Sequence, residues 1–184
     1  MPLFGENNSP GRGENVFVSV GTTRFEKLVA AATSPMALEW MASRGYKSLT
    51  VQYGTGTEPE IDESSAPFPI RTYSFQPSLA EDMEKADLIL SHAGAGTVME
   101  ALKLKKKLVV VINTMLMDNH QTELAGAMAE RGHLFMVENP ELLEERNTWI
   151  SFQDFEPVPH QGGDDQDFPR LLDAYLGFTN VKSD

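Results

Sequence analysis

The chain has 184 residues, a hydrophobic fraction of 41%, no cysteine and a formal net charge of −12. This length suffices for one domain with a sizeable core but not for two full domains. The lack of cysteine excludes disulfides, thiolate zinc sites and thiol nucleophiles, and the negative charge argues against a nucleic-acid backbone as the ligand.

The amino-terminal stretch MPLFGENNSPGRGEN has no apolar core of signal-peptide length, and its composition predicts a disordered leader over residues 1–14. No apolar run approaches the roughly 20 residues that span a bilayer. We therefore expect a cytoplasmic protein whose contact with any membrane comes through a partner.

Six short apolar segments predict strands. They cover residues 16–20, 48–53, 70–75, 87–92, 108–113 and 133–137. The segments LILSH and LVVVIN are almost continuously apolar, which is typical of strands that are covered on both faces of a parallel sheet.

Helical patterns lie between these strands and after them. They cover residues 24–33, 34–45, 78–85, 97–105, 119–131 and 168–176. Ser34 is expected to cap the second helix, with Pro35 in its first turn, and Gly132 to end the fifth. Strands that alternate with helices predict an α/β fold, a Rossmann-like, doubly wound and mostly parallel sheet in a single domain over residues 15–137.

The stretch from residue 138 to 167 contains nine acidic side chains and one arginine. Its composition predicts an acidic, partly flexible and solvated segment. A final helix within residues 168–177 is predicted from the helical spacing of Phe168, Leu171, Leu172 and Tyr175.

The segment LILSHAGAGTVMEAL predicts a strand that ends at His92, a glycine loop, and a helix that begins at Thr97. In a parallel sheet this loop lies at the carboxyl edge, where ligands bind, and a helix N-terminus offers unpaired N–H groups and a partial positive charge. Gly94 and Gly96 let a diphosphate approach the backbone. Thr97 can cap the helix or donate to a phosphate, and Glu100 can accept hydrogen bonds from ribose hydroxyls.

A turn without any ligand and an NAD site are alternative interpretations of this segment. The NAD fingerprint is imperfect, because Met99 occupies the place of its third glycine. Asp118, the acid about 20 residues further on, lies beyond the next strand and not at its end. An NAD-dependent oxidoreductase is therefore disfavoured.

Further polar turns are expected at the same edge of the sheet. Gly21-Thr22 follows the first strand, and Gly54-Thr55-Gly56 follows the second. The loop NTMLMDNHQTELA follows the fifth strand and contains Asn119, the expected N-cap, and Gln121. Together these turns suit a phosphorylated, polyhydroxylated ligand.

Several common sites are missing from the sequence. There is no GxxxxGK[ST] phosphate loop and no G-x-S-x-G nucleophile elbow. His92 and His120 lack the spacing of metal ligands, so no metal is expected.

Four motifs, VSVGTTRFEKLV, VQYGTG, LILSHAGAGTVMEAL and NTMLMDNHQTELA, resemble in this order the small subunit of the dolichyl-diphosphate UDP-N-acetylglucosamine transferase. The resemblance also extends to the carboxyl-terminal domain of the glycosyltransferase family 28 enzymes and covers residues 16–137. It implies one half of a GT-B fold, which binds UDP-GlcNAc as donor substrate without a further cofactor. A membrane-anchored partner would bind the lipid acceptor at the cytosolic face of the endoplasmic reticulum.

The resemblance also implies roles for individual residues in the addition of the second GlcNAc to GlcNAc-diphosphodolichol. Gly21 and Thr22 are expected to border the phosphates. Ala95, Gly96 and Thr97, which follow Gly94, are expected to approach the diphosphate and sugar, and Glu100 the ribose. Gln121 is expected to contact the GlcNAc hydroxyls, with Asn119 beside it. His92 is the candidate base in this chain, although the base is expected on the partner and His92 is expected to be a structural or donor-orienting residue.

Two further points stay open at this stage. The final helix, expected within residues 168–177, packs on its own domain or, as in the family, helps to dock the partner. A nucleotide-sugar-binding or scaffolding module without catalysis would carry the same motifs as a transferase subunit.

Overall fold

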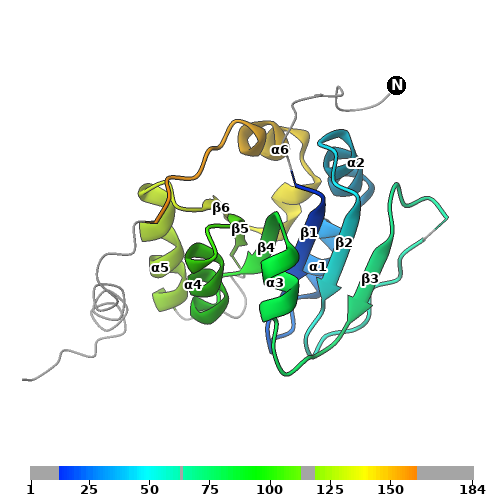
Figure 1. Ribbon diagram of the computed structural model, residues 1–184, viewed down its shortest axis with the longest axis horizontal. Helices are drawn as coiled ribbons and strands as arrows, with labels where there is room; N and C mark the ends of the chain where they lie inside the picture. Colours follow the sequence, from blue (N-terminus) through cyan, green and yellow to red (C-terminus); the bar gives the residue numbers. More distant parts are fainter. Residues whose placement is uncertain (1–12, 63, 113–118, 161–184) are drawn as a thin grey trace, which may run out of the picture.

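The computed structural model describes residues 13–62, 64–112 and 119–160, with the backbone alone for residues 119–121. Six strands form one sheet in the order β3-β2-β1-β4-β5-β6, and every pair of neighbours is parallel (Figure 1). The strands are β1 (Asn15–Ser19), β2 (Ser48–Gln52), β3 (Ile70–Tyr73), β4 (Leu88–His92), β5 (Lys107–Val111) and β6 (Phe135–Val137). The predicted Rossmann-like α/β fold is confirmed.

The strand order reverses between β1 and β4, which lie side by side in the middle of the sheet. Val16 pairs with Leu88 and Ser19 pairs with Ser91. Because all strands run in the same direction, the carboxyl ends of β1 and β4 meet at one edge. In open parallel sheets this point of reversal is where ligands bind.

Helices cover both faces of the sheet (Figure 1). The core of one face takes side chains from α1 (Glu26–Ala32), α2 (Pro35–Ser43), the 3-10 helix η1 (Pro140–Glu144) and α6 (Arg146–Gln153). The core of the other face takes them from α3 (Ala80–Lys85), α4 (Ala95–Lys103) and α5 (Asn119–Glu130). The central strands are buried between these layers, as their apolar runs predict.

Local sequence signals set the ends of several helices as expected. The Ser34 hydroxyl accepts a hydrogen bond from the Ala37 N–H at 3.3 Å, and Pro35 is the first residue of α2. After α5, Gly132 has φ +72°, a left-handed conformation that ends a helix at little cost for glycine.

The structure adds two helices that the sequence analysis missed, η1 and α6, both within the stretch 138–167. Trp149 of α6 is 1% exposed and stacks on Trp40 of α2 with ring centroids 4.5 Å apart. Its Nε1–H donates to the Leu143 carbonyl at 2.7 Å. Two of the acidic residues of this stretch, Glu141 and Glu144, lie on η1, and the buried side chains of η1 and α6 complete the core of one face.

The remaining differences concern boundaries. The helix predicted to begin at Thr97 begins two residues earlier, at Ala95, and the strand predicted from residue 133 begins at Phe135. The connection from β2 to β3 contains no helix or strand in the residues described between 53 and 69. Most of the predicted leader and the whole predicted helix at 168–177 lie outside the described residues.

Candidate functional site

The loops that follow β1 and β2 interlock at the carboxyl edge of the sheet. Gly21 and Gly54 have φ values of +62° and +63°, which glycine adopts without steric cost. A Cβ on Gly54 would stand 2.3 Å from the carbonyl oxygen of Thr23. The Thr55 N–H also donates to this oxygen at 3.2 Å. The two turns are thus packed backbone against backbone.

A buried hydrogen-bond network fixes these turns. The Ser19 hydroxyl donates to Oε1 of Gln52 at 2.8 Å and accepts from the Gly21 N–H at 3.2 Å. Nε2 of Gln52 donates to the carbonyls of Gly21 and Ser74, at 2.6 and 2.8 Å. Ser19 and Gln52 are both fully buried, so each lost partner would leave a costly unpaired polar group.

Hydrophobic periodicity does not predict this network, although the network leaves a signal in the sequence. Ser19 and Gln52 are buried polar residues, and each is the last residue of its strand. Because Gln52 bonds to the loops after β1 and β3, it holds two of the loops at this edge together.

His92, the last residue of β4, lies between two of the predicted glycines. A Cβ on Gly21 would stand 2.9 Å from its Cε1, and a Cβ on Gly94 would stand 2.4 Å from its Nε2. The imidazole therefore leaves no room for a side chain at either position. The structure thus brings His92, Gly21 and Gly94 together, as the motifs predict.

Burial lowers the pKa of His92, and the Ser19 backbone opposes this only in part, so the ring is neutral near pH 7. Its Nδ1 atom is shielded from solvent and makes no hydrogen bond of normal geometry. A neutral, wedged ring is suited to hold the surrounding loops in position.

The first turn of α4 points its free N–H groups out of the same edge. Gly94 is the N-cap and has an extended conformation. The sequence also allowed Thr97 to be the cap, but Thr97 is the third residue of the helix. No side chain caps this end, since Gly94 has none. The N–H groups of Ala95, Gly96 and Thr97 lack intrahelical acceptors, as in the first turn of any α-helix.

Gly96 is exposed, and a Cβ at this position would meet no atom of the described residues within 4 Å. Its φ lies outside the left-handed region, so neither packing nor backbone conformation requires glycine here. Glu100, one turn further along α4, is half-buried. The first turn of α4 therefore exposes backbone at Gly96, where there is no side chain, and the carboxylate of Glu100 follows one turn later.

The other predicted site residues are only partly placed. Thr22 is exposed beside Gly21. Asn119 and Gln121 lie in the first turn of α5, and α5 follows β5, the neighbour of β4. The backbone therefore brings this turn to the carboxyl edge, but the two side chains lie outside the described part. Asn119 is the first residue of the helix.

Three structural observations concern other kinds of site. Two of the larger cavities lie elsewhere, one of about 570 Å³ beside α2 and one of about 320 Å³ at the amino edge. No group of three or more His, Asp or Glu side chains in the described part of the chain could hold a metal ion. Among the same residues, no helix has the length and apolar character needed to cross a membrane.

Similar proteins of known name belong to the family that the sequence motifs resemble. The human protein "UDP-N-acetylglucosamine transferase subunit ALG13" is 48% identical over 120 residues, which cover 65% of this chain and 11% of that protein. The protein of the same name from Yarrowia lipolytica is 35% identical, covering 63% of this chain and 60% of that one. The chain thus spans about a tenth of the human relative, and the resemblance to a UDP-N-acetylglucosamine transferase subunit is confirmed.

Solved structures confirm the fold. A solution NMR structure of ALG13 matches with a TM-score of 0.65 and 23% identity, covering 88% of this chain and 96% of that chain. The crystal structure of MurG from Acinetobacter baumannii matches with a TM-score of 0.53 and 18% identity, covering 92% of this chain and 51% of that chain.

The family model "Glycosyltransferase family 28 C-terminal domain" matches residues 15–151. This range includes all six strands as well as η1, and it ends within α6. The chain therefore belongs to the glycosyltransferase family 28 C-terminal domain family.

Proposed function

We propose that this chain is the donor-binding subunit of a heteromeric, inverting glycosyltransferase. The enzyme transfers GlcNAc from UDP-GlcNAc to GlcNAc-diphosphodolichol and so adds the second GlcNAc of the lipid-linked sugar. Family membership supports the reaction class. The name of the relatives, which contains both a sugar nucleotide and the word subunit, supports the donor and the need for a partner.

Gly96 is the observation that carries the donor-site proposal. Glycine in a helix costs up to about 1 kcal/mol relative to alanine, and the described residues leave the space beside Gly96 empty. A diphosphate bound to the N–H groups of the first turn of α4 would need the space beside Gly96, because a Cβ at this position would hold the diphosphate away from the backbone.

The proposal also gives roles to the other residues of the carboxyl edge. In this proposal Gly94, Ala95, Gly96 and Thr97 bind the diphosphate, with Gly21 and Thr22 along its border. Glu100 accepts from the ribose hydroxyls, and Asn119 and Gln121 bind the GlcNAc.

In the proposed reaction the acceptor hydroxyl attacks the anomeric carbon, its proton passes to a base, and UDP departs with increased negative charge. The N-terminus of α4 stabilises this departing charge. His92 is neutral and its Nδ1 is shielded, which favours a role in positioning the loops and donor. The base then belongs to the partner, which binds the acceptor.

The proposal includes the location of the complex. The described residues contain no candidate membrane span. We infer that a membrane-anchored partner recruits the chain to the cytosolic face of the endoplasmic reticulum, where the lipid acceptor would be bound.

A reconstitution experiment tests the proposal. The chain is purified alone and together with a membrane-anchored partner, and each sample is assayed for transfer from UDP-GlcNAc to a GlcNAc-diphospholipid. Transfer is expected only with the partner. Binding of UDP-GlcNAc without transfer in either sample would favour a non-catalytic module, and turnover by the chain alone would contradict the need for a partner.

A further inference from the structure

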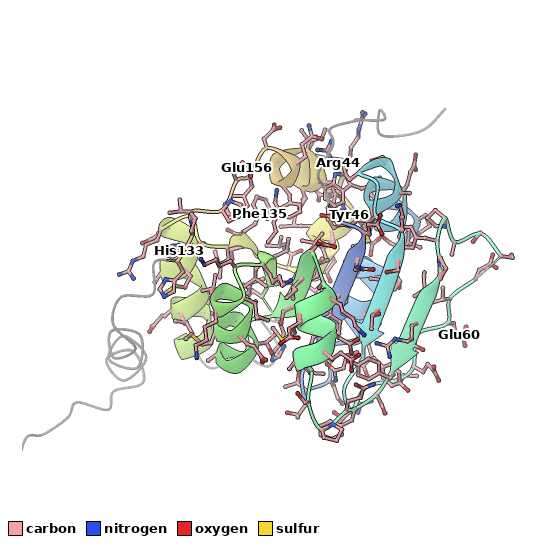
Figure 2. All side chains as sticks on the ribbon, viewed as in Figure 1. Arg44, Tyr46, Glu60, His133, Phe135 and Glu156 are labelled. Carbon is pink, nitrogen blue, oxygen red and sulfur yellow. The ribbon has the colours of Figure 1, made fainter. Side chains whose placement is uncertain are left out.

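A cavity of about 320 Å³ lies at the amino edge of the sheet, opposite the candidate donor site. It is enclosed by α2, by α6 and by the turn that follows α4. Its wall combines cationic and aromatic side chains: Arg44, Lys105, Lys107, Trp40, Tyr46 and Phe152. Figure 2 shows Arg44 and Tyr46 beside the amino end of β1.

Arg44 is the most unusual residue of this wall. It is only 7% exposed and forms no ion pair with another described residue. Its Nε atom is buried and has no hydrogen-bond partner. Arginine is almost never buried unless it is paired, because an unpaired buried charge is strongly destabilising.

The neighbouring Trp40 shows the same deficit. It is 2% exposed, and its Nε1–H is buried without an acceptor. Two buried N–H donors of cavity-lining residues thus lack partners among the described residues, whereas buried donors in native proteins are as a rule satisfied.

Lys105 occupies a position where the fold favours glycine. Its φ is +54°, and among the described residues no other non-glycine residue has a positive φ. The N–H groups of Lys105 and Lys106 close the end of α4 by bonding to Leu102 and Ala101, each at 3.0 Å. Glycine is the usual residue at such a helix end, so backbone geometry does not explain the lysine.

Two carboxylates also line the cavity, Asp87 and Glu156. Oδ2 of Asp87 already accepts from the N–H groups of Glu14 and Asn15, at 2.7 and 3.0 Å. Within the described chain neither carboxylate forms an ion pair with Arg44. Three cationic side chains against two carboxylates leave the wall with an excess of positive charge.

We propose that this cavity binds a small phosphate-bearing molecule. Phosphate oxygens match the planar donors of a guanidinium and the ammonium groups of nearby lysines. The volume lies at the lower end of the range of ligand pockets, about 300–1,000 Å³, so a phosphate fits with a small organic group. The rings of Trp40, Tyr46 and Phe152 provide an apolar surface for that group.

Titration of the full 184-residue chain with inorganic phosphate and with phenyl phosphate, at constant ionic strength, tests the proposal. Saturable shifts of the backbone amide signals of residues 44–46 and 105–107 are expected in NMR spectra. Phenyl phosphate should bind more tightly than inorganic phosphate because of the aromatic wall.

Two variants separate binding from folding. Arg44→Met should weaken phosphate binding by about tenfold or more without loss of thermal stability, because the buried Nε that it removes has no hydrogen-bond partner among the described residues. Lys105→Gly should also weaken binding, while its melting temperature stays equal or rises, since glycine suits φ +54°.

Lys103→Gln provides the matched control, because Lys103 is exposed near the same helix end and lies outside the cavity. It should change the affinity by less than about twofold. Unchanged affinity in Arg44→Met, or shifts confined to Gly21 and residues 94–97, would overturn the proposal in favour of phosphate binding at the donor edge.

Discussion

Gly94 and Gly96 stand two residues apart at the start of α4, but different causes exclude larger side chains from the two positions. The imidazole of His92 occupies the space beside Gly94, whereas no residue that the structure describes fills the space beside Gly96. Packing thus requires glycine at position 94, whereas the proposed function assigns the glycine at position 96 to close approach of the diphosphate. Two substitutions can test this difference.

Gly96→Ala should separate stability from donor binding. The variant should gain up to about 1 kcal/mol of stability from helix propensity and lose at least about tenfold in affinity for UDP-GlcNAc. Thermal unfolding and calorimetric titration measure the two effects. Gly126→Ala is the matched control, because Gly126 lies within α5 and also has open space around its Cβ position. Equal donor affinities in both variants would remove Gly96 from the site.

Gly94→Ala should destabilise the protein by about 1–3 kcal/mol, since the new methyl group overlaps His92. The same substitution should cost much less in a His92→Ala background, where the ring is gone. Urea unfolding of the wild type, both single variants and the double variant gives the coupling energy. Additive effects would show that His92 does not restrict position 94.

The buried His92 should also make stability depend on pH. Its pKa is lowered from the ordinary value of 6.5, with burial as the main cause. Between the two pKa values the unfolded chain binds more protons, so the free energy of unfolding should decrease as pH falls below 6.5.

Unfolding in urea at about pH 7.5 and about pH 5.5 measures this dependence, and His92→Gln should reduce it. His160→Gln serves as a comparison, because burial and the nearby His133 and Arg131 also lower the pKa of His160. A pH dependence that is unchanged in His92→Gln would contradict the assignment.

At the scale of elements, α6 shows how an acidic stretch contributes to the core. Trp149→Ala should lose about 3–5 kcal/mol of stability, because Trp149 is 1% exposed and is stacked on Trp40. Ile150, its neighbour on the exposed side of α6, is the control. Ile150→Ala should cost less than about 1 kcal/mol, as measured by chemical denaturation, and losses of similar size would disprove the packing role of α6.

The strands could be predicted from the sequence because their apolar, β-branched runs reflect burial between two layers of helices. The helix α6 could not, since its sequence RNTWISFQ mixes polar and apolar residues in an acid-rich region. Its position depends on contacts of Trp149 and Phe152 with Trp40, which is distant in sequence. The start of α4 was placed too late because Thr97 is a preferred capping residue, whereas the backbone uses Gly94.

The candidate site could be predicted at the level of motifs but not of contacts. Spacing identified the turn residues Gly21, Gly94 and Gly96 and the strand end at His92. The fit of His92 between two glycines and the bonds of Gln52 to two loops depend on which strands are neighbours. That information lies in the strand order, which periodicity alone does not contain.

At the scale of the whole molecule, the sheet separates two edges of different character. The carboxyl edge presents glycine turns and a helix N-terminus, and the amino edge presents a cavity with Arg44 and Lys105. A strand of five residues spans about 16 Å, so groups at the two edges lie beyond direct contact. Charge at one edge should therefore have little effect on ligands at the other.

This separation predicts additive behaviour. Arg44→Met should leave the affinity for UDP-GlcNAc within about twofold of the wild type, and Gly96→Ala should do the same for phenyl phosphate, because distant sites without shared partners are independent. In the double variant each affinity should equal that of the relevant single variant, measured by titration of both ligands. A loss of donor affinity in Arg44→Met alone would instead indicate that the sheet couples the two edges, since Arg44 lies too far from the donor edge to touch the sugar nucleotide.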